Sequence, residues 1–109
     1  MMLTDQQFQQ ESSDSLERLY RRLGSASEDY DFDVEMNGGA LTVEFEDPPE
    51  RFVVSPNSPV KQIWVSAHVQ SFKLDWAPEA GSFVLAATGQ TLDELMEAAI
   101  QKRLQNFAL

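Results

Sequence analysis

The stretch EDYDFDVEMNGGALTVEFED, residues 28–47, carries the clearest fold signal in the chain. Asn37-Gly38 is a favoured two-residue turn, and the residues on both sides of it alternate between apolar and polar types, which predicts a β-hairpin. If Asn37 and Gly38 form the loop, one face of the hairpin is apolar. Its facing pairs are Met36 with Gly39, Val34 with Leu41, Phe32 with Val43, and Tyr30 with Phe45.

The opposite face of this predicted hairpin is crowded with carboxylates. Its facing pairs are Asp33 with Thr42, Asp31 with Glu44, and Asp29 with Glu46. Like charges directly opposite one another destabilise an antiparallel pair, so we expect a cation or a basic protein surface to relieve the repulsion. Facing carboxylates roughly 4.5–5.5 Å apart could share one hydrated hard cation such as Ca²⁺, Mn²⁺ or iron. The alternative is a solvated strand whose charges discourage edge pairing.

The rest of the chain predicts one helix before the hairpin, further strands after it, and a closing helix. Both helices begin at capping boxes, at Thr4 and Thr91, and Gly24 fits a stop for the first. The expected helices cover 4–23 and 91–107, the expected strands 51–55, 60–66, 71–76 and 82–87, and the expected turns or loops 47–50, 55–59 and 77–81. Prolines exclude a central strand at 47–50.

Short connections between about six strands favour an antiparallel sheet. Each helix has a single apolar stripe, so both can cover one face of the sheet and leave the other in water. The predicted fold class is α+β, a two-layer α–β–α sandwich formed by a single domain, residues 1–109.

Composition excludes several kinds of function. The chain has 18 acidic and 8 basic residues, a formal net charge of −10, which repels phosphate backbones and argues against nucleic acid as a partner. There are no cysteines, so thiolate metal sites and a cysteine nucleophile are excluded. No apolar run reaches the roughly 18 residues of a membrane helix, and the start of the chain does not resemble a secretory signal.

Catalytic motifs are missing from the sequence. His68 is the one histidine, expected in a loop between two strands, and neither a triad spacing nor a phosphate-binding loop accompanies it. We therefore predict that the chain performs no bond chemistry. A ferroxidase that oxidises Fe²⁺ at the carboxylates is an open alternative, although such sites usually hold two irons inside a helical bundle.

Trp64 lies in the strand segment VKQIWVSA, where Ile63 and Val65 suit the helix-covered face. Alternation then places Trp64 and Gln62 on the open face, and an exposed tryptophan often marks a contact site. Asn57, in the proline-flanked loop before this strand, could extend the patch. The alternative is that a neighbouring loop or Trp76 shields Trp64.

The acidic hairpin, Lys61-Gln62-Ile63-Trp64, Asp75-Trp76 and Thr91-Leu92-Asp93-Glu94-Leu95 together resemble the frataxin family over about residues 3–104. The resemblance implies an α–β–α sandwich without a catalytic pocket. It further implies weak, multi-site binding of Fe²⁺ or Fe³⁺, with other divalent cations as substitutes. The implied partners are a cysteine desulfurase and the scaffold protein of iron–sulfur cluster assembly.

The resemblance also implies which residues act. The implied metal-binding acidic ridge falls on Glu28, Asp29, Asp31, Asp33, Glu44 and Glu46, and the implied partner-binding residues are Asn57, Gln62, Trp64 and Lys73. Two features depart from the family pattern. Arg21 and Arg22 stand where the family usually continues its acids along the first helix, and the loop at 55–59 reads SPNSP in place of Asn-x-Gln-x-Pro.

The function expected from these features is an iron-binding regulator that docks on the desulfurase and modulates sulfur transfer to the scaffold. An acidic interaction module without a metal role is the alternative. We expect a monomer, with iron-bound oligomers left open. The expected location is a bacterial cytoplasm, or the mitochondrial matrix if a presequence was removed.

Overall fold

A computed structural model describes residues 3–109 of the chain, so Met1 and Met2, which belong to the predicted domain span, lie outside the described residues. The α-helices are α1 (Asp5–Ala26) and α2 (Leu92–Arg103), and a 3₁₀ turn, η1, spans Ser58–Val60. The strands are β1 (Asp33–Asn37), β2 (Ala40–Glu46), β3 (Pro49–Asn57), β4 (Gln62–Ala67), β5 (Gln70–Ala77) and β6 (Ser82–Val84).

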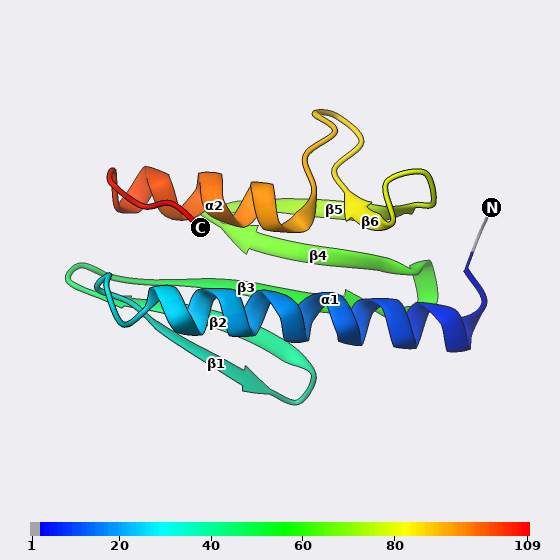
Figure 1. Cartoon of the computed structure of the whole chain (residues 1–109), viewed down its shortest axis with the longest axis horizontal. Coiled ribbons are helices and arrows are strands. Elements are labelled where there is room, and N and C mark those ends of the chain that lie inside the picture. Colours follow the sequence, from blue (N-terminus) through cyan, green and yellow to red (C-terminus); the bar gives the residue numbers. More distant parts are fainter. Residues whose placement is uncertain (1–2) are drawn as a thin grey trace.

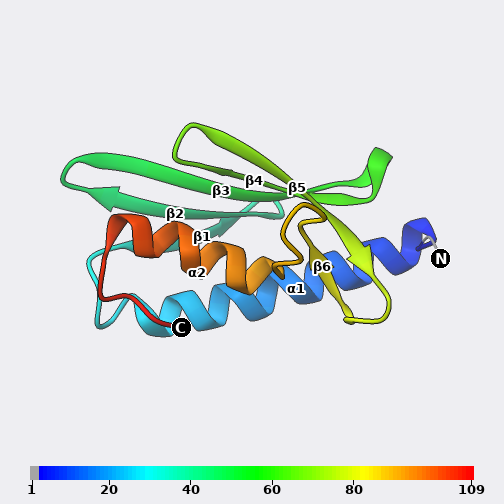
Figure 2. The ribbon, with the colours of Figure 1, turned by 90° about the horizontal axis from the view of Figure 1, so that it is seen from above.

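The six strands form one antiparallel sheet in the order in which they occur in the chain, β1 to β6. The two helices lie side by side along the sheet (Figure 1), and both are on the same face of it (Figure 2). This confirms the predicted α+β sandwich. Neither described helix combines the length and apolar character that crossing a bilayer requires.

The core lies between the helices and the covered sheet face. Helix α1 buries one stripe, α2 buries another, and the strands contribute every second side chain, as the helical and strand periods require. The buried apolar residues include Phe8, Leu16, Leu19 and Leu23 from α1, Leu41, Val43, Phe52, Val54, Ile63, Val65 and Leu74 from the sheet, and Leu95, Met96 and Ile100 from α2.

Both predicted capping boxes are present. In each, the threonine hydroxyl accepts a hydrogen bond from the backbone N–H three residues on, while the side chain at that position accepts one from the threonine N–H. Caps of this kind contribute about 1 kcal/mol each. They fix where Thr4 and Thr91 start the helices, and thereby which face each helix turns to the sheet.

The first helix does not end at Gly24, where the sequence predicted its end. Helix α1 continues to Ala26, and Ser27 closes it by donating from its N–H to the Leu23 carbonyl and from its hydroxyl to the Gly24 carbonyl. The second helix is shorter than predicted and ends at Arg103. Phe107 lies beyond it and is nevertheless buried, because the chain folds back against the core there.

The hairpin register differs from the prediction by two residues. Gly38 and Gly39 form the loop, with φ of 63° and 85°, and Asn37 pairs with Ala40 inside the ladder. A type I′ turn needs positive φ at both central positions, which two glycines adopt most easily. Since side chains alternate with period two, a shift of two residues leaves the faces unchanged and changes only the pairs.

Prolines enter the third strand, contrary to the prediction of a turn at 47–50 and a loop at 55–59. Pro49 is the first residue of β3 and Pro56 lies next to its end. Proline cannot donate to the ladder, and strand ends are where this loss is tolerated. The central part of the strand therefore keeps its pairing with β2 and β4.

The remaining strand limits differ by a few residues. Strand β4 begins at Gln62 rather than at residue 60, because Lys61 adopts a left-handed conformation with φ of 53° after η1. Strand β6 ends at Val84 rather than at residue 87. The chain then turns through 86–88 and reaches Thr91, which bridges back to Val84.

His68 lies in the β4–β5 turn, as predicted, but its ring is not free in solvent. The side chain is 24% exposed, Nε2 lies 2.8 Å from the Ala99 carbonyl oxygen, and Nδ1 lies 3.2 Å from a Glu50 carboxylate oxygen. The ring also packs edge-on against Phe52. His68 therefore joins the turn to α2 and β3, which is a structural role.

We predict that Val69→Asn stabilises the protein. Val69 is the second residue of the His68-Val69 turn, is fully exposed, and has φ of 57°, a left-handed conformation that is unfavourable for a β-branched residue. Asparagine adopts this conformation more readily, so urea unfolding should show a gain of roughly 0.5–1 kcal/mol. Val60→Asn, at an exposed valine in η1, is the control and should change stability little. Equal effects of the two changes would contradict the prediction.

Candidate interaction surface on the open sheet face

Four of the six predicted ridge acids surround one small hollow at the β1 edge of the sheet. Its volume is about 170 Å³. We call this site the acidic hollow and define it by its four acidic lining residues, Asp31, Asp33, Glu44 and Glu46. Ser27, Tyr30 and Phe32, from the segment after α1, also line the hollow. Glu28 and Asp29 lie in the turn directly after α1, and neither lines the hollow.

The acids do not form the row of facing pairs that the sequence predicted. Strand β1 begins at Asp33, so Asp29 and Asp31 belong to the preceding turn and bend and have no ladder partners. The one acid pair in the ladder is Asp33 with Glu44. The repulsion between Asp33 and Glu44 is relieved in part by Arg51, which lies on β3 directly opposite Glu44.

The Arg51–Glu44 ion pair leaves most of the acidic charge uncompensated. The closest guanidinium nitrogen and carboxylate oxygen are 3.5 Å apart, and the side chains are 65% and 42% exposed. Exposed pairs of this kind contribute at most about 1 kcal/mol and weaken with salt. The acidic hollow therefore keeps a net negative charge that an approaching cation or basic side chain can satisfy.

A preformed metal cage is not part of this surface. Over residues 3–109, no group of three or more aspartate, glutamate, histidine or cysteine side chains converges closely enough to hold an ion. The donor set is nevertheless all carboxylate oxygen, which suits hard cations that keep part of their water. The arrangement fits loose binding through water and does not fit tight chelation.

The four predicted partner residues, together with Asp75, form a second, more ordered region, which we call the Trp64 patch: Asn57, Gln62, Trp64, Lys73 and Asp75. Trp64 is 37% exposed on β4, as predicted from the alternation of the strand. Its Nε1–H donates to the Gln62 carbonyl oxygen over 2.9 Å, and the Gln62 amide donates to an Asp75 carboxylate oxygen over 3.0 Å. These bonds hold the indole and the amide in one orientation.

Lys73 and Asn57 complete the patch from the neighbouring strands. Lys73 lies on β5 directly opposite Trp64, and its Nζ is 4.9 Å from the centre of the indole ring. A cation–π contact of this kind contributes about 0.5–1 kcal/mol at an exposed site. Asn57 ends β3 opposite Gln62, and its side chain caps no helix. Trp76, the alternative shield for Trp64, instead packs against Phe83 on the covered face.

A shallow hollow adjoins the indole. It measures about 360 Å³ and is lined by Val53, Ser55, Trp64, Val65, Ser66, Ser71, Phe72 and Lys73. Small hydroxyl side chains beside a large aromatic ring leave room for a side chain of another protein. Anchors of interfaces commonly fill such hollows next to aromatic residues.

The acidic hollow and the Trp64 patch share the sheet face that the helices leave free. In the ladders, Asp33, Glu44 and Arg51 form one row, and Ser55, Trp64 and Lys73 form another, whereas Val43 and Ile63 belong to the covered side. Figure 2 shows that no helix crosses the uncovered face. One partner can therefore contact both regions at once.

Sequence reasoning missed Asp75 and Arg51 as members of this surface. A two-residue turn at His68-Val69 places Asp75 opposite Gln62, so the register of β4 and β5 was the available signal. The dipeptide His68-Val69 does not predict a type I′ turn, because such turns normally contain asparagine or glycine. Arg51 required the register of β2 and β3, which the prolines obscured.

Comparison with other proteins is consistent with these observations. The chain is 32% identical over 75 residues to the iron–sulfur cluster assembly protein CyaY of Pseudomonas entomophila strain L48, covering 69% of this chain and 67% of that protein. It is 30% identical over 98 residues to the protein of the same name from Azotobacter vinelandii strain DJ, covering 88% and 84%. These relatives are named as assembly proteins and not as enzymes.

Solved structures share the fold. The frataxin from Psychromonas ingrahamii superposes with a TM-score of 0.78 at 24% identity, covering 94% of this chain and 93% of that one. Yeast frataxin superposes with a TM-score of 0.72 at 23% identity, covering 94% and 85%.

Two helices on one sheet face and a polar, partly acidic surface on the other define a protein of the α+β sandwich class. The family model described as the frataxin-like domain matches residues 1–106. The chain therefore belongs to the frataxin-like family, as the sequence motifs indicated.

We predict that Trp64→Ala lowers the free energy of unfolding by no more than about 1 kcal/mol, because the indole lies on the exposed face. Leu74→Ala, on the neighbouring strand with no exposed surface, is the comparison and should cost about 2–5 kcal/mol. Urea unfolding of both variants measures the difference. A comparable loss in both would mean that Trp64 supports the core.

Proposed function

We propose that this chain works in iron–sulfur cluster assembly as a regulator without bond chemistry of its own. In this proposal it docks on a cysteine desulfurase, close to the scaffold protein, and modulates the delivery of sulfur to the scaffold. The names of its relatives support the assembly role. The observation that carries the docking role is that the acidic hollow and the Trp64 patch lie on one uncovered sheet face.

The acidic hollow supplies the electrostatic part of the proposed docking. Its carboxylates are exposed or half-buried, Arg51 neutralises one of them only partly, and the chain as a whole carries a formal charge of −10. Charge of one sign over a surface steers an oppositely charged partner and raises the association rate more than the final affinity. A basic desulfurase surface is the complement that this charge favours.

The Trp64 patch supplies the ordered part. The hydrogen bonds from Trp64 to Gln62 and from Gln62 to Asp75 exist before any partner arrives, so little side-chain freedom remains to be lost on binding. Tryptophan contributes strongly at interface centres, while Asn57 and Lys73 offer hydrogen bonds around it. This division suits a rapid approach guided by charge, followed by a specific contact.

Iron is proposed as a weakly bound cargo of the acidic hollow and the adjoining Glu28 and Asp29. Fe²⁺ or Fe³⁺ would keep most of its water and contact carboxylates singly or in pairs such as Asp33 with Glu44. Other divalent cations would compete. The proposed setting is a bacterial cytoplasm, in keeping with the bacterial relatives, and the proposed state without iron is a monomer.

The docking proposal predicts a loss of desulfurase binding in two kinds of variant. Trp64→Ala should weaken binding through faster dissociation, and the pair Asp33→Asn with Glu44→Gln should weaken it roughly tenfold through slower association that depends on salt. The matched control is Asp14→Asn with Glu79→Gln, which removes the same charge from α1 and the β5–β6 turn. Surface plasmon resonance at two salt concentrations separates the two rates. Equal losses for both charge pairs would contradict a specific acidic surface.

The metal proposal predicts amide NMR shifts on titration with Fe²⁺, or with Co²⁺ as a substitute, that are centred on residues 28–46. The same acid pair should reduce these shifts, and the control pair should leave them in place. Shifts confined to other parts of the chain would remove the metal role. Desulfurase binding that persists in a metal-free buffer would then leave an interaction module without iron.

A further inference from the structure

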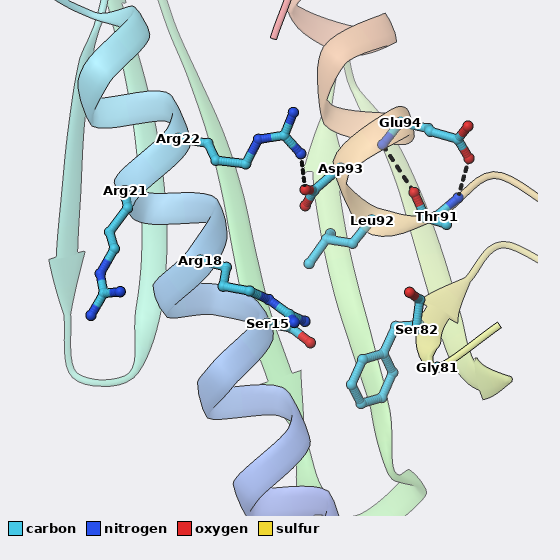
Figure 3. A pocket seen from close by; sticks show the side chains of 11 residues that line it. Ser15, Arg18, Arg21, Arg22, Gly81, Ser82, Thr91, Leu92, Asp93 and Glu94 are labelled. Carbon is cyan, nitrogen blue, oxygen red and sulfur yellow. Dashed lines mark hydrogen bonds and ion pairs between the residues drawn. The ribbon is translucent and has the colours of Figure 1, made fainter. Parts of the chain in front are cut away.

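A cavity of about 680 Å³ separates the middle of α1 from the start of α2, on the helix-covered side of the molecule and apart from the surface described above. Ser15, Arg18 and Arg22 line it from α1, while Ser82 and Phe83 line it from β6. Figure 3 shows Arg18 and Arg22 pointing from α1 toward the start of α2, whereas Arg21 points to the other side of the helix. The cavity combines an apolar floor with polar groups at its rim.

The cavity has more basic than acidic residues in its lining, although the protein as a whole is acidic. Three of the 8 basic residues, Arg18, Arg21 and Arg22, line it together with the carboxylates of Asp93 and Glu94. Arg21 donates to Glu17 over 2.6 Å, and Arg22 donates to Asp93. Arg18 is exposed and makes no hydrogen bond or ion pair with another residue within 3–109, so its guanidinium is free to bind a ligand at the cavity.

The carboxylates at the cavity are already engaged. Asp93 accepts from Arg22, and Glu94 turns back to accept from the Thr91 N–H over 2.9 Å. Since Thr91 in turn accepts from the Glu94 N–H, the free amide donors of the first turn of α2 are those of Leu92 and Asp93. Backbone N–H groups at a helix start favour an anion.

Ser15 places a hydroxyl group in the cavity. The residue is only 7% exposed, lines the cavity, and its hydroxyl has no hydrogen-bond partner among the described residues. Its oxygen faces the cavity beside the Arg18 side chain (Figure 3). No side-chain nitrogen or oxygen of the described residues is both buried and unpaired, so the Ser15 oxygen keeps access to the cavity, where a bound oxyanion or water can hydrogen-bond to it.

We propose that this cavity binds a small oxyanion, an organic molecule carrying phosphate or carboxylate groups. Arg18 is the main anchor, because guanidinium groups bind phosphate and carboxylate oxygens in a fork of two hydrogen bonds. Ser15 and the N–H groups at the start of α2 add donors, and Phe83 and Leu92 offer an apolar wall for the carbon skeleton. The site is distinct from the acidic hollow in both position and sign of charge.

The test is an amide NMR titration of the whole chain with inorganic phosphate and, separately, with citrate, each at constant ionic strength against a chloride series. Saturable shifts at Ser15, Ser82 and Leu92 are expected with at least one of the two probes. Arg18→Gln should weaken binding about tenfold, as expected for loss of a charge-assisted hydrogen bond. Lys102→Gln, the same change of charge elsewhere on α2, should leave the affinity unchanged.

Ser15→Ala is a second variant, which keeps helix propensity and should also weaken binding. Saturation with phosphate assigns the phosphate class, and saturation with citrate alone assigns the carboxylate class. Shifts with neither probe, shifts that never saturate, or equal losses in the Arg18 and Lys102 variants would overturn the proposal.

Discussion

The structure depends on the fact that two helices cover only one face of a six-stranded sheet. Side chains alternate across each strand, so this one-sided cover decides the surroundings of every strand residue. In β2, Val43 is fully buried against the helices while its neighbour Glu44 remains half-exposed on the other side. The apolar side chains on the covered face stabilise the fold, and the polar side chains on the other face remain accessible to other molecules.

The uncovered face contains two regions with different physical character. In the acidic hollow, like charges gather, and among residues 3–109 only Arg51 forms an ion pair with them, so the region attracts positive charge without selecting a particular partner geometry. In the Trp64 patch, the hydrogen bonds through Gln62 to Asp75 fix the orientation of each group. The proposed docking face thus combines unpaired negative charge in one region with fixed side-chain orientations in the other.

The distribution of arginines gives the molecule two electrostatic sides. The last turns of α1 carry Arg21 and Arg22 where the family pattern leads one to expect acids, so the acidic ridge is confined to the hairpin and the turn before it. Arg22 also ties α1 to Asp93 at the start of α2. Together with Arg18, Arg22 also places a guanidinium group at the cavity between the helices.

The sequence by itself determined the two capped helices, the antiparallel hairpin, the exposed position of Trp64 and the family, because these depend on local patterns of period two and 3.6 and on turn chemistry. Only the tertiary structure decided which acids face one another, since a shift of two residues at Gly38-Gly39 leaves the alternation intact. It also decided the contacts of His68 and Asp75 and the position of Arg18 near the start of α2, because these depend on segments far apart in the chain or on ladder registers that no local pattern fixes.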